Sequence, residues 1–242
     1  MKTRYIDLAL FDSRGTRATK EERTMKRLKI FLSAILAGIC IGIGGTVFLS
    51  VDNTIVGAFL FTSGLFVICT SGLHLYTGKV CYCLDNPVSY LIDLPFIWAG
   101  NLVGTWCVAK LMLLTRSGPG LAQRAASICE TKLSDSVGSV FILAFFCNIL
   151  IYFAVDGYKN IEHEIGKYLA LFFGVVVFIF CGFEHCIANM YYFSVAGVWE
   201  PHTWFYLIVI TIGNGVGGLF FPVLKKITKQ KNVPQKNNDA KS

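Results

Sequence analysis

A glutamate and a histidine lie inside one of the most apolar stretches of the chain. Glu184 and His185 interrupt the run from Phe178 to Met190, which is otherwise apolar enough to lie in a bilayer. A titratable side chain at membrane depth costs about 2.5–3.5 kcal/mol on insertion scales, so it usually faces a cavity or a partner and marks a pathway. We therefore expect His185 to be the centre of function, against the alternative of a hydrogen-bonded packing histidine.

A second polar interruption lies earlier in the chain, at residues 71–79, where two glycines are mixed with hydroxyl and imidazole side chains. Lipid satisfies no backbone N–H or C=O group, so non-helical backbone at membrane depth must be buried in protein or line a wet cavity. This break is a second candidate for the pathway. His74 within it is equally well explained as a cap of the broken backbone. His163 and His202 lie in loops, where we expect them to be solvated.

Other chemistry has little support in the sequence. Most of the nine cysteines lie in apolar runs, and Cys81-Tyr82-Cys83 has neither the spacing nor the neighbours of a metal site, so we expect no metal and no disulfide framework. A haem carrier or membrane enzyme would need pairs of histidines across two spans, yet only His74 and His185 lie at depth, and we expect no cofactor. A structural scaffold gives no reason for two matched interruptions.

The composition predicts that a membrane surrounds these residues. Of 242 residues, 54% are hydrophobic and 15% are charged, and the mean hydropathy of +0.58 is too high for a soluble domain of this size. The net charge of +7 comes mainly from lysines and arginines near the two termini. This distribution fits cytoplasmic tails beside anionic membrane lipid better than a nucleic-acid footprint. We expect no signal peptide, because a long polar lead precedes the first apolar run.

The apolar runs predict an all-α integral membrane protein with six spans, of which the second and fifth are interrupted. The spans cover about 30–51, from 55 to the break at 71–79, about 90–114, about 136–155, about 168–198 and about 204–224. We expect residues 1–29 to form a basic cytoplasmic lead, 30–224 a channel domain, and 225–242 a basic cytoplasmic tail. Residues 115–135 are expected to form the longest internal loop, on the outer side of the cytoplasmic membrane.

An internal repeat divides the chain. Gly100-Asn101-Leu102-Val103-Gly104 has a near copy in Gly213-Asn214-Gly215-Val216-Gly217, and each copy follows an interrupted span. The two units, about 30–114 and 136–224, contain three spans each, so they must insert with opposite topology. Inverted repeats with broken helices at matching positions are typical of a transport path whose site lies near the midplane. The helix ends exposed there present N–H groups that suit a small anion.

Helical spacing assigns different roles to the neighbouring polar residues. On a continuous helix, Phe178, Cys181, Gly182, His185 and Asn189 share one face, and Glu184 is turned about 100° away. We expect Glu184 to brace the fold by accepting hydrogen bonds from free backbone N–H groups of the facing break. A similar stripe on the second span contains Phe61, Leu65, Ile68 and Gly72, and the fourth span offers Asn148 with Ile151 or Tyr152. Helix packing explains these stripes as well as a pore does. Lys132, considered alone, is a surface charge.

The motifs resemble those of the formate/nitrite transporter family over about residues 25–225. Leu75-Tyr76-Thr77-Gly78 resembles the family's Leu-Phe-Thr-Gly loop, and Gly100–Gly104 resembles its third-span motif. Gly182-Phe183-Glu184-His185-Cys186-Ile187-Ala188-Asn189-Met190 is similar to its Gly-Phe-Glu-His-Ser-Ile-Ala-Asn-Met segment. The resemblance implies an aquaporin-like fold with interrupted second and fifth helices, and a homopentamer with one pore in each subunit.

The resemblance also implies roles for individual residues. His185 would be the central pore histidine, Thr77 its partner on the facing loop, and Lys132 an anion attractor at the outer vestibule. Phe61 and Phe178, with Asn148, would form an outer constriction. Leu65, Tyr76 and Ile151 would form an inner constriction.

Three residues depart from the family pattern. Tyr76 stands where the formate channel has Phe, His74 where an acidic residue is usual, and Lys79 where Asn is common. The expected substrate class is therefore a small monovalent anion or its conjugate acid, such as formate, nitrite, hydrosulfide or a larger monocarboxylate. Its passage is expected to be passive and to depend on pH.

Overall fold

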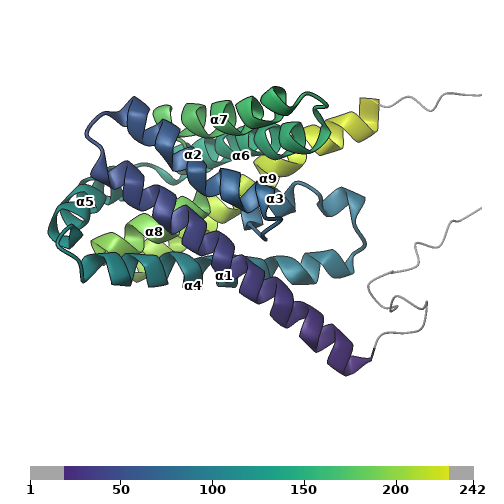
Figure 1. Cartoon of the computed structure of the whole chain (residues 1–242), viewed down its shortest axis with the longest axis horizontal. Helices are drawn as coiled ribbons and strands as arrows, with labels where there is room; N and C mark the ends of the chain where they lie inside the picture. The colour runs from purple at the N-terminus through teal and green to yellow at the C-terminus, as the bar shows by residue number, and fades with distance from the viewer. Residues whose placement is uncertain (1–18, 229–242) are drawn as a thin grey trace, which may run out of the picture.

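The computed structural model describes residues 19–228, which form an all-helical bundle (Figure 1). Four helices, α1, α4, α6 and α9, are long and apolar enough to cross a membrane, and α2 is a shorter apolar helix. The helices of the described residues are α1 (Lys20–Ser50), α2 (Thr54–Thr70), α3 (Tyr76–Val80), the short 3₁₀ helix η2 (Cys83–Asp85), α4 (Ser89–Leu113), α5 (Gly118–Ser134), α6 (Val137–Asn160), α7 (Glu164–Phe180), α8 (Cys186–Ala196) and α9 (Pro201–Thr228). The predicted all-α membrane fold is confirmed.

The bundle has two distinct ends. Helix α5 covers one end, and the described chain begins and finishes at the other, as Figure 1 shows. We call these the α5 end and the terminal end. Residues 1–18 and 229–242, which make up most of the predicted basic lead and tail, lie outside the described residues.

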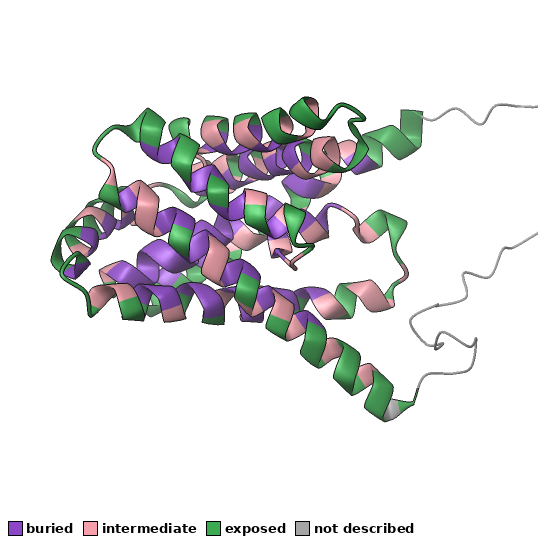
Figure 2. Cartoon of the chain, viewed as in Figure 1, coloured by how far each residue is buried: buried purple, intermediate pink, exposed green. Residues whose placement is uncertain are grey.

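The first helix begins earlier than predicted. Thr19 caps it through a reciprocal pair of hydrogen bonds: its hydroxyl accepts from the N–H of Glu22, and the Glu22 carboxylate accepts from the N–H of Thr19. Helix α1 therefore includes residues 20–29, which the sequence analysis had placed in a polar lead. Figure 2 shows these first turns exposed, where they project from the bundle.

Residues 115–135 are not the long loop that was predicted. Most of them form α5, which has Pro119 in its first turn, a position where proline's missing N–H costs nothing. The buried side chains of Leu121, Ala125 and Cys129 are spaced four residues apart, and this apolar stripe packs against α8. The glycines and proline at 118–120 were interpreted as loop residues, although they mark the start of a helix.

The repeated glycine motifs bring two pairs of helices into close contact. A Cβ atom at Gly104 would overlap the carbonyl oxygen of Ile35, so α4 lies directly on the backbone of α1. In the same way, a Cβ atom at Gly217 would overlap the carbonyl oxygen of Phe145, and α9 lies on α6. Small residues at such contacts allow membrane helices to approach closely. The core lies between these pairs, and α8 is buried along its whole length from Cys186 to Val195 (Figure 2).

Candidate functional site

Two helix breaks with the same backbone geometry form the centre of the site. Helix α2 ends at Thr70 before α3 starts, and α7 ends at Phe180 before α8 starts. Gly72 and Gly182 lie just beyond these ends at φ angles of 66° and 67°, a left-handed conformation that favours glycine. The N–H two residues past the cap turns back in each case, from Leu73 to the Ile68 carbonyl and from Phe183 to the Phe178 carbonyl.

Each break is held by an asparagine from the repeated glycine motif. The amide of Asn101 donates to the carbonyl oxygens of Ala34 and His74, and its oxygen accepts from the N–H of Tyr76 at 2.9 Å. Asn214 makes the equivalent set in the second half. Its amide donates to the carbonyl oxygens of Ala144 and Glu184, and its oxygen accepts from the N–H of Cys186 at 2.8 Å. The backbone groups freed by the breaks are therefore satisfied by side chains, as their burial requires.

The two breaks meet through a hydrogen bond between His185 and Thr77. The Nε2 atom of His185 lies 2.9 Å from the Thr77 hydroxyl oxygen, and both residues are buried. His185 is also the N-cap of α8, because its Nδ1 atom accepts from the N–H of Ala188 at 3.1 Å. An Nδ1 atom that accepts a hydrogen bond carries no proton, so the neutral ring holds its proton on Nε2 and donates it to Thr77.

An aromatic ring covers one face of the His185 imidazole. The ring of Phe178 stacks on the imidazole with a centroid distance of 5.4 Å, and the ring of Phe61 meets Phe178 edge-on at 6.4 Å. Phe61 is 1% exposed and Phe178 is 3% exposed, so both residues are buried. Their role as an outer constriction, which the resemblance implies, stays a prediction.

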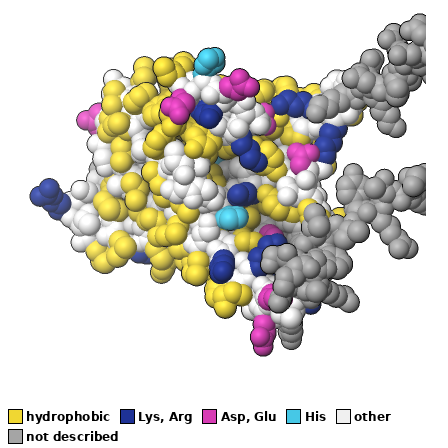
Figure 3. Space-filling view, turned by 45° about the vertical axis from the view of Figure 1, so that its right-hand side comes forward, with side chains coloured by type: hydrophobic (Ala, Val, Ile, Leu, Met, Phe, Trp, Pro, Cys, Tyr) yellow, Lys and Arg dark blue, Asp and Glu magenta, His cyan; other side chains and the backbone are white. Residues whose placement is uncertain are grey.

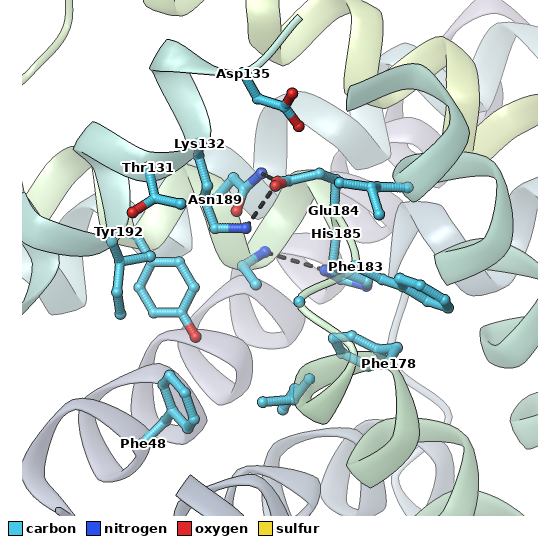
Figure 4. Close-up of a pocket in the computed structure, with 15 residues that line it drawn as sticks. Phe48, Thr131, Lys132, Asp135, Phe178, Phe183, Glu184, His185, Asn189 and Tyr192 are labelled. Carbon is cyan, nitrogen blue, oxygen red and sulfur yellow. Dashed lines mark hydrogen bonds and ion pairs between the residues drawn. The ribbon is translucent and has the colours of Figure 1, made fainter. Parts of the chain in front are cut away.

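A cavity of about 290 Å³ lies at the α5 end, above His185 (Figure 4). Its polar lining includes Lys132 from α5 and Glu184, His185 and Asn189 from the second break and α8. The Lys132 ammonium donates to the Glu184 carboxylate at 2.8 Å, and the Asn189 amide donates to the same oxygen at 2.6 Å. The Lys132 side chain is 14% exposed and that of Glu184 is 3% exposed, so this is a nearly buried ion pair.

These contacts correct the predicted role of Glu184. The Glu184 carboxylate accepts hydrogen bonds from Lys132 and Asn189, not from the backbone of the facing break. In that break, the N–H of Tyr76 donates to the side-chain oxygen of Asn101. The predicted common face of Phe178, Cys181, Gly182, His185 and Asn189 is also wrong, because the helix stops at Phe180 and restarts at Cys186. Cys181 and Gly182 are exposed.

Asn148 of α6 contacts the first helix break. Its amide donates to the Thr77 carbonyl at 3.1 Å and lies 3.8 Å from the Cys81 sulfur. Its own amide oxygen is buried and has no hydrogen-bond partner among the described residues. Asn148 therefore joins α6 to the first break, and its place in an outer constriction with Phe61 and Phe178 stays a prediction.

A second cavity, of about 180 Å³, lies toward the terminal end. Leu65 from the predicted inner constriction lines it, whereas Ile151 is buried outside it. Tyr76 does not line it either, because its hydroxyl turns to α9 and lies 3.4 Å from the Thr211 carbonyl. The polar lining comes from four residues, of which only Lys79 was singled out from the sequence: Lys79, Tyr82, Tyr158 and Lys159.

Comparison with known proteins identifies the family. The sequence profile of the formate/nitrite transporter family matches residues 13–227 of the chain. The chain belongs to the formate/nitrite transporter family. It is accordingly a membrane transport protein and not an enzyme, as the sequence predicts.

Characterised and uncharacterised relatives agree with this assignment. The chain is 31% identical over 184 residues to the uncharacterised transporter YrhG of Bacillus subtilis, with 70% of this chain and 69% of the relative covered. It is 26% identical to the formate channel FocB of Escherichia coli, covering 68% of this chain and 65% of that one. It is 27% identical to the nitrite transporter NirC of Escherichia coli, covering 80% and 81%.

Two solved structures share the fold. A pentameric formate channel with formate bound superposes with a TM-score of 0.71 at 27% identity, covering 84% of this chain and 97% of that one. An ion channel of the same family gives a TM-score of 0.76 at 23% identity, covering 86% and 92%. This formate/nitrite transporter therefore has the fold of its family's channels.

Proposed function

We propose that this formate/nitrite transporter is a passive, pH-dependent channel for small monovalent anions, which cross as their conjugate acids. Formate, nitrite and hydrosulfide represent the substrate class. Support comes from the relatives named as formate channels and nitrite transporters. The observation that carries the proposal is the pair formed by His185 and Thr77, which lies buried between two cavities at opposite ends of α6.

The path runs from the cavity at the α5 end, past Phe178 and Phe61, to the cavity that Leu65 lines. A bare anion between these buried rings would lose its hydration without a compensating charge, which is costly, whereas the neutral acid avoids most of that cost. An anion that leaves water for such a site gains affinity for a proton. In this proposal, water in the cavity supplies the proton to the anion.

His185 polarises the path and is not the proton source. Protonation of Nδ1 would break the hydrogen bond from the Ala188 N–H that caps α8, so the ring stays neutral with its Nε2–H directed at Thr77. The Thr77 hydroxyl then donates toward the passing acid. Asn148, whose amide oxygen has no partner among the described residues, accepts from the acid's O–H just below.

The fold assigned to this function has six spans in two inverted units, with α2–α3 and α7–α8 as the interrupted second and fifth spans. The equivalent hydrogen bonds of Asn101 and Asn214 support that internal equivalence. We assign the chain to the cell membrane with both termini cytoplasmic, because lysines and arginines gather on the face where the described chain begins and ends (Figure 3). A homopentamer is supported by the pentameric formate channel.

Flux into vesicles that contain the purified protein tests the proposal. Formate, nitrite and hydrosulfide should each cross faster than in empty vesicles, and the flux of each should fall about tenfold per pH unit above that acid's own pKa. Lactate tests the size limit. A break in the pH profile at one common pH for all the acids would show titration of a protein group instead and would contradict passage as the neutral acid. A protein with no flux above empty vesicles would contradict the channel itself.

A further inference from the structure

The two halves match in backbone but differ in charge. Asn101 accepts from the N–H of Tyr76 and Asn214 accepts from the N–H of Cys186, so Tyr76 and Cys186 occupy equivalent positions. Each asparagine also donates to the carbonyl of the residue two positions earlier, which is His74 in the first half and Glu184 in the second. His74 is therefore the counterpart of Glu184. Counting three residues onward from Tyr76 and Cys186, Lys79 is the counterpart of Asn189. In the second half the Glu184 carboxylate is hydrogen-bonded to the Asn189 amide. In the first half the corresponding groups are the His74 imidazole and the Lys79 ammonium.

This exchange leaves Lys79 without an acidic partner. The His74 imidazole turns away toward α1, where its Nδ1 atom lies 2.8 Å from the Ser33 hydroxyl oxygen. His74 lines a separate hollow beside α1, whereas Lys79 lines the cavity at the terminal end. Within residues 19–228, no carboxylate forms an ion pair with Lys79.

Lys159 reaches the same cavity from the last turn of α6. Its ammonium lies 4.2 Å from the centroid of the Tyr82 ring, and no carboxylate of the described chain forms an ion pair with it. Tyr82 also lines the cavity, and its buried hydroxyl has no hydrogen-bond partner among the described residues. Two lysines and a tyrosine with an unpaired hydroxyl therefore line the same small cavity.

The nearby acids are occupied by other lysines. Lys225 of α9 lies 3.0 Å from the Asp156 carboxylate, and Lys226 lies 3.0 Å from the Asp85 carboxylate. The cavity lining contains two lysines and no acid, for a formal charge of +2. The lining of the cavity at the α5 end contains Lys132, Glu184 and Asp135, for a formal charge of one minus two, or −1.

We propose that Lys79, Lys159 and Tyr82 form an anion-loading site at the terminal end, distinct from Lys132 and specific to this end of the path. Its ligand is a small monovalent anion such as formate, bound between the two ammonium groups with the Tyr82 hydroxyl as a donor. Unpaired charge in a small low-dielectric cavity concentrates counter-ions. The site rests on the proposed function in that the bound anion is the one that then crosses.

Thiol chemistry at Cys69 tests the potential of this cavity without any transport. Cys69 lines the cavity, so its rates of modification by an anionic and by a cationic methanethiosulfonate report the local charge. Peptide mass spectrometry follows Cys69 separately from the other cysteines. The anionic-to-cationic rate ratio should fall about tenfold in Lys79→Asn/Lys159→Gln, where position 79 takes the residue of its counterpart Asn189. Lys110→Gln, which removes an exposed lysine from the last turn of α4 near the α5 end, is the control and should leave the ratio unchanged.

Formate protection tests binding itself. Formate, exchanged for gluconate at constant ionic strength, should slow the anionic modification of Cys69 in the wild type and not in the double variant. An equal ratio in wild type and double variant, or no protection by formate, would overturn the site. In vesicles of known orientation, the double variant should raise the half-saturating formate concentration several-fold at the terminal end only, and an equal rise at both ends would also overturn it. Absence of formate flux in the wild type would contradict the proposed function and leave the Cys69 result to decide this site.

Discussion

The Nε2 atom of His185 and the hydroxyl oxygen of Thr77 lie 2.9 Å apart, although 108 residues separate them in the chain. Each belongs to a different helix break, and each break is clamped by its own asparagine. The contact is therefore the point at which the two halves of the molecule join in the middle of the proposed path. Its geometry depends on both halves at once.

Removal of the Thr77 hydroxyl should lower flux without unfolding the protein. In Thr77→Val the Nε2–H of His185 loses its buried acceptor, at a cost of about 1–3 kcal/mol, and the path loses its polarised donor. We expect formate flux in vesicles to fall at least tenfold. Thr77→Ser keeps the hydroxyl and should retain most of the flux. Equal flux in the valine and serine variants would contradict a role for this hydrogen bond.

His185→Asn separates capping from polarisation. Asparagine is a good N-cap residue, so α8 should keep its first turn and the thermal midpoint should change little. The path loses the Nε2–H donor, and formate flux should fall at every pH while the shape of the pH profile is kept. A profile that changes its midpoint in His185→Asn would indicate that the imidazole titrates during transport.

Loss of one partner of the buried Lys132–Glu184 ion pair should destabilise the protein more than loss of both partners. Lys132→Met or Glu184→Gln leaves one buried charge unpaired, which typically costs about 3–5 kcal/mol, so each single variant should unfold at lower temperature. The double variant removes both charges and should recover much of that loss. Additive losses in a thermal double-mutant cycle would show that the two groups do not interact.

The asparagine clamps should be essential for the breaks. Asn101→Leu leaves the Tyr76 N–H and the Ala34 and His74 carbonyls without this partner, and each unpaired buried group costs about 1–3 kcal/mol. We expect loss of folded protein in detergent, measured by size-exclusion chromatography. Asn101→Asp keeps the acceptor for the Tyr76 N–H but places a carboxylate oxygen against the Ala34 and His74 carbonyls, so it should also lose folded protein. A leucine variant as stable as the wild type would contradict the clamp.

The close helix contact at Gly217 should not accept a methyl group. A Cβ atom there would overlap the Phe145 carbonyl, so Gly217→Ala must push α9 away from α6, and such overpacking costs at least about 1–3 kcal/mol. Gly138→Ala, where no atom lies within 4 Å of the new Cβ, is the control and should leave the thermal midpoint unchanged. Equal midpoints for the two variants would mean that the contact is looser than described.

The sequence predicts well those features that are local or repeated. The glycines of the two breaks, the copied motif around Asn101 and Asn214, and the central position of His185 all follow from residue type and spacing. The contact of His185 with Thr77 needed the resemblance to the family, because no local pattern links two residues on different spans.

Features that depend on packing between distant segments could not be predicted in this way. The partner of Glu184 is Lys132, which lies in a segment that glycine and proline made look like a loop. The hydrogen bond from Asn148 to the Thr77 carbonyl was not predicted either, because helical periodicity gives the face of a helix and not the depth at which that face meets another element. Lys159 lies beyond the predicted end of the fourth span at about residue 155, and only the fold brings it to the same cavity as Lys79.

The clamp of the second break has a consequence for how the protein is made. The N–H of Cys186 and the carbonyl of Glu184 are paired by Asn214 on α9, the last helix of the described chain. During synthesis from the N-terminus these groups have no such partner until α9 has been inserted. The first break is completed earlier, by Asn101 on α4. A nascent chain that stops before α9 therefore carries one finished half and one open half, and the path becomes functional only with the final helix.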